Sequence, residues 1–374
     1  MLCSLGCRRA TPTPPAPPEM PAEMAAWFQP PQDFNLAPAR SRSPLLFYDG
    51  SPVKTAADWP RRREEILQRW QEIMGPWPEL LEKPDGLVVE ATDRENVIQK
   101  KLQLQISPNQ TVEAFLLVPK TPGRHPAVFV PCYDVPGTLG LGKASLRDIA
   151  WQLSKRGFVT LTLGPPGGNP RTPDTAGAHC QPLSYLAYIG SNCANWLATL
   201  PEVDPQRIGI YGHAYGGKWA MFASCLGDRF ACAVWSDPGI VFDERKPGPD
   251  YWNPWYLGFE TTPPRVPQRR GEEEGRTRSG AYKVLIDNHL DLTELHALMA
   301  PRPFLVSAGS ERRPGWAASS ADTEASWSAL EQTVAVNRLL GYDQRVAMTN
   351  RPGHEPTAQS NEQVYQFLSY FLKP

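Results

Sequence analysis

The sequence lacks an excess of charge, a long apolar run and a cysteine pattern typical of metal sites. Its 38 basic and 39 acidic residues give a formal net charge of −1, which argues against a nucleic-acid partner because such a partner usually requires a basic surface. It has no apolar run of about 18 residues, so no transmembrane segment is expected. The seven cysteines include no C-x-x-C pair, and neither a metal nor a cofactor is expected.

The 374 residues suffice for one large core with an added segment. Residues 1–24 are rich in proline and are expected to form a disordered tail or the remnant of a signal. Residues 1–9 resemble the end of a bacterial lipoprotein signal but lack its charged and apolar regions. We expect export if a segment is missing upstream, and a cytoplasmic location otherwise.

Residues 25–96 are predicted to form a helical appendage. One helix is bounded by Asp58 as a candidate cap, Pro60 in the first turn and Gly75 after the end. Its apolar residues recur at helical spacing, which predicts a helix packed on the main domain.

From residue 97 to residue 374, strand and helix patterns alternate. Residues 127–130 form a continuous apolar run, which is typical of a central parallel strand. The other expected buried strands are 158–163, 207–211, 231–235, 304–307 and 345–348, and helices are expected near 146–156 and 184–199. The spacing of these elements predicts an α/β fold with a mainly parallel central sheet and helices on both faces.

One stretch, residues 238–280, interrupts this alternation. It is rich in proline and aromatic residues and carries a charged run. Because it is too long for a simple connection, it is expected to be a lid-like or substrate-binding insertion.

The most informative motif is Gly212-His213-Ala214-Tyr215-Gly216. It follows the strand at 207–211 and precedes a helix-like run at 218–226. A strand, a sharp G-x-S-x-G turn and a helix form the nucleophile elbow of hydrolases. Here Ala214 stands where the serine would be, and its methyl group cannot attack an ester.

Hydrolysis at such an elbow also needs a base, an acid that orients it and an oxyanion hole. His354 follows the last predicted strand, in R-P-G-H-E-P, and is the candidate base. For the acid we favour Asp322, in the loop after strand 304–307, although it also suits the cap of the next helix. Glu311 in the same loop and Asp237, directly after strand 231–235, are the alternatives.

The oxyanion hole is expected to use two backbone N–H groups. One is that of Tyr215, at the start of the helix after the elbow. The other is expected from the loop after strand 127–130, around Cys132, Tyr133 and Asp134.

With these residues in place, the chain resembles the carbohydrate-esterase branch of the α/β-hydrolases, in particular acetyl xylan esterases and glucuronoyl esterases. The resemblance covers about residues 97–373. It is carried by Gly212 to Lys218, by the segment from Asp228-Arg229-Phe230 to Ser236-Asp237-Pro238-Gly239, and by Leu298-Met299-Ala300-Pro301-Arg302-Pro303. It implies an α/β-hydrolase fold and hydrolysis of a carbohydrate-linked ester without a cofactor.

The resemblance also implies roles for single residues. A Ser-x-x-Gly-Lys pattern in glucuronoyl esterases places a lysine near the sugar, which here is Lys218. The same enzymes can take their acid from the position of Asp237. Trp252 and Trp255 in the insertion suit stacking on a sugar ring, or form the insertion's own small core.

Three functions follow as hypotheses. The first is a serine esterase for carbohydrate-linked esters whose nucleophile is replaced by Ala214, so that little or no activity is expected. The second is a natural pseudo-hydrolase that binds a ligand without cleaving it. The third, a peptidase-like hydrolase, is least favoured because the chain is too short for the propeller domain that such peptidases usually carry. The expected partner is a small-molecule or carbohydrate ester.

Overall fold

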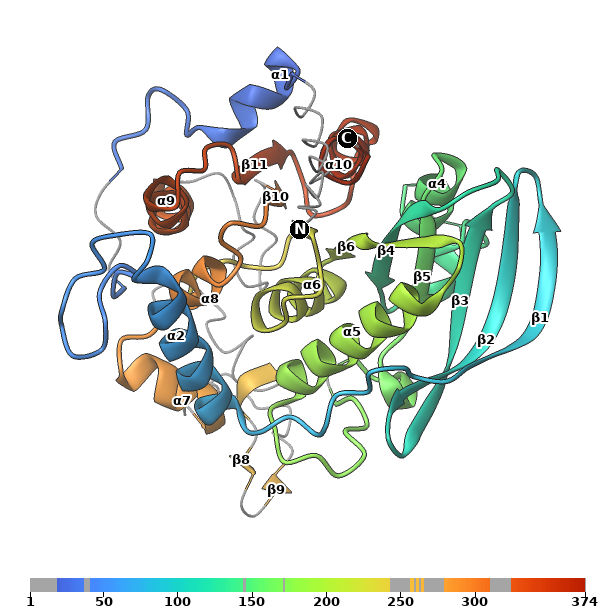
Figure 1. Cartoon of the computed structure of the whole chain (residues 1–374), viewed down its shortest axis with the longest axis horizontal. Helices are drawn as coiled ribbons and strands as arrows, with labels where there is room; N and C mark the ends of the chain where they lie inside the picture. Colours follow the sequence, from blue (N-terminus) through green and yellow to red (C-terminus); the bar gives the residue numbers. More distant parts are fainter. Residues whose placement is uncertain are drawn as a thin grey trace, which may run out of the picture.

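A nine-stranded sheet with strand order β1-β2-β3-β5-β4-β6-β7-β10-β11 forms the centre of the molecule (Figure 1). The computed structural model describes residues 19–36, 41–143, 146–170, 172–242, 256–258, 260–261, 264–265, 279–309 and 324–373. The sheet strands are β1 (Gly86–Arg94), β2 (Val97–Ser107), β3 (Gln110–Pro119), β4 (His125–Pro131), β5 (Val159–Leu163), β6 (Val203–His213), β7 (Cys232–Ser236), β10 (Phe304–Gly309) and β11 (Val346–Arg351).

The sheet is mixed but mostly parallel, which confirms the prediction from the alternating pattern. From β5 through β4, β6, β7 and β10 to β11, every neighbouring pair is parallel. At the other edge, β1, β2 and β3 pair in antiparallel fashion, and β3 joins β5 in the same way. The carboxyl ends of the parallel strands therefore meet at one edge, which is where ligands bind in α/β sheets.

Helices cover both faces of the parallel strands, as predicted. Alternate residues of β4 point to opposite faces, because side chains in a strand have a period of two. Ala127 and Phe129 pack in the core beneath α5 and α6, whereas Val128 and Val130 pack in the core beneath α4 and α10. The main helices are α2 (Trp59–Met74), α4 (Ile149–Lys155), α5 (Pro182–Thr199), α6 (Tyr215–Leu226), α8 (Leu292–Ala297), α9 (Glu324–Leu339) and α10 (Ala358–Leu372).

Shorter elements complete the described part. They are α1 (Ala22–Ala25), η1 (Ala26–Phe28), α3 (Val135–Thr138), η2 (Pro166–Gly168), α7 (Gly280–Asp287) and the strands β8 (Glu260–Thr261) and β9 (Pro264–Arg265), which pair with each other. The last two and the buried Tyr256 belong to the predicted insertion at 238–280, much of which lies outside the described residues. No described helix is both long and apolar enough to cross a membrane.

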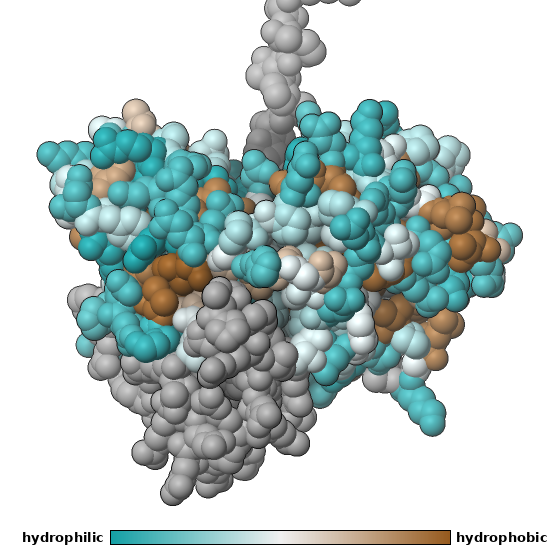
Figure 2. Space-filling view, turned by 90° about the horizontal axis from the view of Figure 1, so that it is seen from below, coloured by the Kyte–Doolittle hydropathy of each residue, from teal (hydrophilic) through white to brown (hydrophobic). Residues whose placement is uncertain are grey.

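The sheet begins earlier in the chain than the sequence predicts. Residues 86–94 fall within the segment expected to be a helical appendage, yet they form β1 and pair with β2. Nearly all of β1 is exposed, and Leu87 is 66% exposed. With neither face buried, no alternation of apolar and polar residues marks this strand. β1 lies at the right-hand end of Figure 1, and Figure 2 shows apolar patches at that end.

A buried ion pair fixes the appendage helix to the main domain. Arg62 of α2 donates to Glu294 of α8, both side chains are almost fully buried, and the Tyr48 hydroxyl donates to Glu294 Oε2 at 2.9 Å. Burial raises the pKa of Glu294, while Arg62 lowers it. We expect Glu294→Ala to cost about 1–3 kcal/mol of unfolding free energy, because Arg62 loses its buried partner and its remaining ionic partner, Glu65, is partly exposed. Urea denaturation measures this loss.

The apolar double variant Arg62→Met/Glu294→Leu is the control for that prediction. It removes both charges together and is expected to restore most of the stability. A Glu294→Ala variant as stable as the unmodified chain would contradict the prediction.

His296 is a buried histidine that makes stability depend on pH. Its two ring nitrogens have no hydrogen-bond partner in the part of the chain that the structure describes, and the ring lies 5.4 Å from that of Trp235. Burial lowers the pKa of His296 to about 3. The unfolded chain therefore takes up this proton first as pH falls. The free energy of unfolding is expected to drop by about 1.4 kcal/mol for each pH unit below 6.5, down to the lowered pKa.

His296→Phe removes this titration but keeps an aromatic ring. Urea unfolding of both proteins at pH 7.5 and pH 5.5 measures the effect. The unmodified chain is expected to lose more stability between the two pH values than the variant. Equal losses would contradict the assignment.

Candidate active site

The turn between β6 and α6 has the backbone geometry of a nucleophile elbow. Ala214 has φ 54° and ψ −113°, in a region that residues other than glycine rarely enter. Its N–H donates to Ser236 O at 2.8 Å, which ties the elbow to the end of β7. A Cβ atom on Gly212 would lie 1.9 Å from Gly216 O. Only glycine therefore fits at position 212.

His354 lies beside this elbow and contacts one of the candidate acids. Its Nδ1 is 2.6 Å from Asp237 Oδ2, and its ring centroid is 4.8 Å from that of His213. The side chain of Asp237 is 1% exposed and that of His354 is 27% exposed. A buried carboxylate thus orients a histidine that remains accessible, which is the arrangement of an acid and a base in a hydrolase.

Of the three candidate acids, Asp237 is the one that lies among the described residues, and its side chain contacts His354. Asp322, which the sequence favours, and Glu311 both lie outside the described residues. Asp237 follows β7 directly and has a positive φ of 52°. Its N–H donates to Ser307 O at 2.9 Å, and its Oδ1 accepts the Gly309 N–H at 3.1 Å. These bonds fix the carboxylate at the carboxyl ends of β7 and β10.

Sequence reasoning did not single out Arg351, the last residue of β11. Its guanidinium is buried, donates to Asp237 Oδ2 at 3.1 Å and donates to Ser307 O at 2.9 Å. The cation thereby balances the buried carboxylate next to the histidine. The sequence feature that could have indicated its role is its position, a few residues before His354 at the end of the same predicted strand.

His213, inside the elbow, is the second histidine of the site. Its Nδ1 is 2.9 Å from Ser236 Oγ. Burial lowers the pKa of His213 well below its usual value, and the nearby His354, Arg351 and Arg147 lower it further. The ring is therefore neutral at pH 7. Its Nε2 has no hydrogen-bond partner among the described residues.

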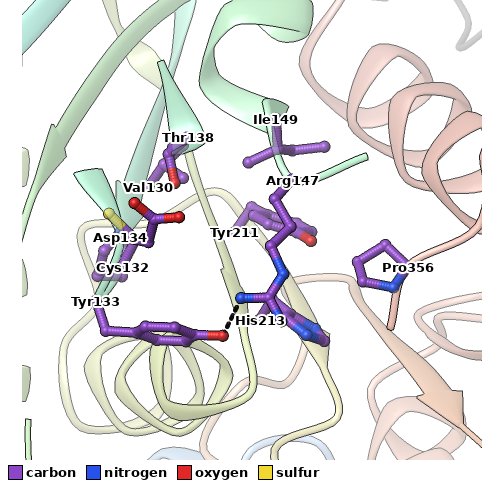
Figure 3. Close-up of a pocket in the computed structure, with 11 residues that line it drawn as sticks. Val130, Cys132, Tyr133, Asp134, Thr138, Arg147, Ile149, Tyr211, His213 and Pro356 are labelled. Atoms are coloured by element: carbon purple, nitrogen blue, oxygen red, sulfur yellow. Dashed lines mark hydrogen bonds between the residues drawn. The ribbon is translucent and has the colours of Figure 1, made fainter. Parts of the chain in front are cut away.

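A small pocket that is partly open to solvent lies at the carboxyl ends of β4 and β6. In Figure 3, Arg147 and Tyr133 meet across it, and Arg147 Nη1 donates to the Tyr133 hydroxyl. Arg147 Nη2 also donates to Glu355 Oε1 at 2.7 Å. The lining residues are Val130, Pro131, Cys132, Tyr133, Asp134, Thr138, Arg147, Ile149, Tyr211, His213 and Pro356.

The loop after β4 lies next to the elbow, where the predicted oxyanion hole requires it. A Cβ atom on Gly216 would lie 2.3 Å from Pro131 O, so the end of β4 touches the first turn of α6. The Tyr215 N–H belongs to the amino end of α6, where backbone N–H groups and the helix dipole attract negative charge. Tyr133 is 43% exposed and directs its hydroxyl to Arg147.

Lys218, predicted to lie near a sugar, is buried in the structure. It is 2% exposed, its Nζ donates to Pro238 O, and the ring of Tyr256 lies 5.9 Å from Nζ. Burial lowers the pKa of Lys218 well below its usual value, and Asp237 opposes this effect. Trp252 and Trp255, the other predicted sugar contacts, lie outside the described residues.

The chemistry available at this edge of the sheet is proton transfer and stabilisation of an oxyanion. The described residues contain no group of three or more histidine, cysteine, aspartate or glutamate side chains that could hold a metal. A histidine paired with a buried carboxylate lies beside the amino end of a helix. Residue 214, at the turn before that helix, carries a methyl group.

Comparison with known proteins gives a partial sequence match. No protein-family model matches the chain. Carbohydrate esterase MZ0003, from an unknown prokaryotic organism, is 25% identical over 196 residues, which make up 50% of this chain and 38% of that protein. The match thus spans well under half the length of this curated relative.

Solved structures of other proteins match this chain over most of its length. A glucuronoyl esterase from Solibacter usitatus matches with a TM-score of 0.69 and 18% identity, over 90% of this chain and 98% of that one. A promiscuous CE15 esterase from the marine bacterial metagenome matches with a TM-score of 0.65 and 18% identity, over 90% of this chain and 100% of that one. These likenesses show that the chain has the α/β fold of the CE15 carbohydrate-esterase structures.

Proposed function

We propose that this protein carries the active site of a serine-type esterase for carbohydrate-linked carboxylic esters, with Ala214 at the nucleophile position. Little or no turnover is expected in this form. The observation that carries the proposal is the 2.6 Å contact between His354 Nδ1 and the buried Asp237, beside an elbow that keeps its positive φ. A histidine paired with a buried carboxylate at this place is the base of a serine hydrolase.

The proposed substrate class rests on the relatives. The curated relative is named a carbohydrate esterase, and the matching structures include glucuronoyl esterases. A sugar-linked ester is therefore the substrate class we propose. Contacts of the sugar with Lys218, Trp252 and Trp255 remain predictions.

With serine at position 214, the described groups would take the roles of a hydrolase. His354 would accept the serine proton, and Asp237 would hold the ring in the tautomer that can do so. The Tyr215 N–H and a donor from the loop that contains Tyr133 would bind the oxyanion. His354 would then give the proton to the leaving alcohol. Water would hydrolyse the acyl-enzyme, which frees the carboxylic acid and restores the serine. With alanine at position 214, the hydroxyl oxygen that would form the acyl-enzyme is absent from that position.

A second function, binding without cleavage, is favoured by a specific feature of the site. Asp237 accepts bonds from Arg351 and Gly309 as well as contacting His354. These bonds hold the carboxylate in place without any need for catalysis. A pseudo-hydrolase could therefore keep the pair for structural reasons while it binds an ester or a related ligand.

The experiment that tests the proposal compares the unmodified chain with Ala214→Ser on a short-chain aryl ester. Hydrolysis by the serine variant alone supports an esterase site that lacks its nucleophile. If neither protein hydrolyses the ester, the esterase proposal fails. Binding of a non-hydrolysable amide analogue, measured by calorimetry, would then support the second function.

A further inference from the structure

The guanidinium of Arg351, at the end of β11, contacts the residue after β7, a residue of β10 and the loop that contains His354. Besides its bond to Asp237, Nη1 donates to Ser307 O at 2.9 Å and to Ser307 Oγ at 3.0 Å. Nη2 donates to His354 O at 2.6 Å, and Nε donates to Glu355 O at 3.1 Å. The side chain of Arg351 is 2% exposed. One buried cation therefore contacts the acid, the neighbouring strand and the backbone of the base.

The two contacts in the histidine loop restrict how His354 can move. Arg351 holds the carbonyl groups of His354 and of the residue after it. The same guanidinium holds Asp237, which contacts the ring of His354. Arg351 thus holds the backbone of His354 directly and its ring through Asp237. A displacement of about 1 Å in such a pair can cost a hundred-fold in rate.

Arg351 and His354 also share one carboxylate oxygen. Both contact Asp237 Oδ2, at 3.1 Å and 2.6 Å. The arginine therefore helps to fix the position of the oxygen that contacts the imidazole ring.

From these contacts we propose that Arg351 is a positioning residue of the site: it fixes the Asp237–His354 pair by holding the carboxylate and the backbone of the histidine loop. The proposal rests on the esterase function proposed above. Among the residues that the structure describes, the charged and titratable groups near His354 are Asp237, Arg351, His213 and the Arg147–Glu355 pair. Of these, Arg351 is the cation bonded to both the acid and the histidine backbone.

The kinetic test uses Ala214→Ser as the parent and compares Arg351→Lys with Arg351→Gln. Arg351→Gln is expected to lower kcat about a hundred-fold with KM within about three-fold, because positioning is lost while the substrate contacts remain. Arg351→Lys keeps the charge but not the fork of donors. It is therefore expected to lose less activity than Arg351→Gln.

The matched control is Arg302→Gln. Arg302 also satisfies carbonyl groups, with Nη1 bonds to Gly227 O at 3.0 Å and Phe230 O at 3.1 Å. It lies before the amino end of β10, whereas the site lies at the carboxyl end. The control is expected to lose stability without the hundred-fold fall in kcat. A fall in kcat that is equal in both glutamine variants, or absent from both, would overturn the proposal.

A second measurement does not depend on hydrolysis. In the unmodified chain, NMR of nitrogen-labelled histidine follows the Nδ1 proton of His354, which a short bond to Asp237 shifts to low field. The signal is expected to persist in Arg302→Gln and to move or disappear in Arg351→Gln, with Arg351→Lys as the folded alternative. An unchanged signal in both Arg351 variants would overturn the positioning role. An inactive serine parent would overturn the esterase function alone.

Discussion

Replacing Ala214 by serine is expected to raise kcat/KM for a short-chain aryl ester by roughly four to six orders of magnitude, since loss of the nucleophile costs a serine hydrolase about a million-fold. That gain corresponds to about 5–8 kcal/mol of transition-state stabilisation. It is expected because the elbow already holds residue 214 at φ 54° and His354 already contacts Asp237. Steady-state kinetics on the two proteins measure the ratio.

Ala214→Gly is the matched control for this gain. Glycine suits the positive φ at least as well as alanine but provides no oxygen. It is expected to leave the rate of the unmodified chain unchanged. A serine variant no faster than the glycine variant would show that the elbow, base and oxyanion groups do not form a working site.

The second large effect is expected from Asp237→Asn in the serine variant. An amide at this position can donate to Nδ1 and so hold the imidazole in the wrong tautomer, a change that costs about ten-thousand-fold in kcat in a related arrangement. Asp237 lies 2.6 Å from His354 Nδ1, so the same loss is expected here. The measurement is kcat for Ala214→Ser with and without the second change.

Asp322→Asn in the same background separates the two acid candidates. If Asp237 is the acid, this control is expected to stay within about three-fold of the serine parent, the range of ordinary context effects. A ten-thousand-fold loss from Asp322→Asn, with little loss from Asp237→Asn, would assign the acid to the loop after β10. The two substitutions differ only in place, because each removes one carboxylate and adds one amide.

The parts of the fold that sequence could predict are those coded by short-range patterns. The apolar run at 127–130 belongs to β4, and the glycines around Ala214 mark a turn whose geometry leaves no room for a Cβ at Gly212. Helix α2 ends at the predicted Gly75, which has φ 88°. In each case a few neighbouring residues determine the structure.

The choice among acids could not be made in that way. Asp237, Asp322 and Glu311 all follow strands whose carboxyl ends lie at the same edge of the sheet, and sequence spacing does not say which side chain turns toward His354. In Asp237 that direction depends on a positive φ and on the Gly309 N–H, which is distant in sequence. The role of Arg351 was hidden for the same reason, since Asp237 follows β7 and Ser307 lies on β10, both far from Arg351 in sequence.

The positive φ of Ala214 suits serine as well as it suits alanine, so the backbone at this turn is no obstacle to an exchange between the two residues. Alanine and serine codons can differ by a single base, and both residues carry similar backbone strain at this turn. The residue can therefore change in either direction without a change of fold. If Ala214→Ser hydrolyses an ester as expected, one point mutation in a gene that encodes this elbow is enough to gain or to lose that activity.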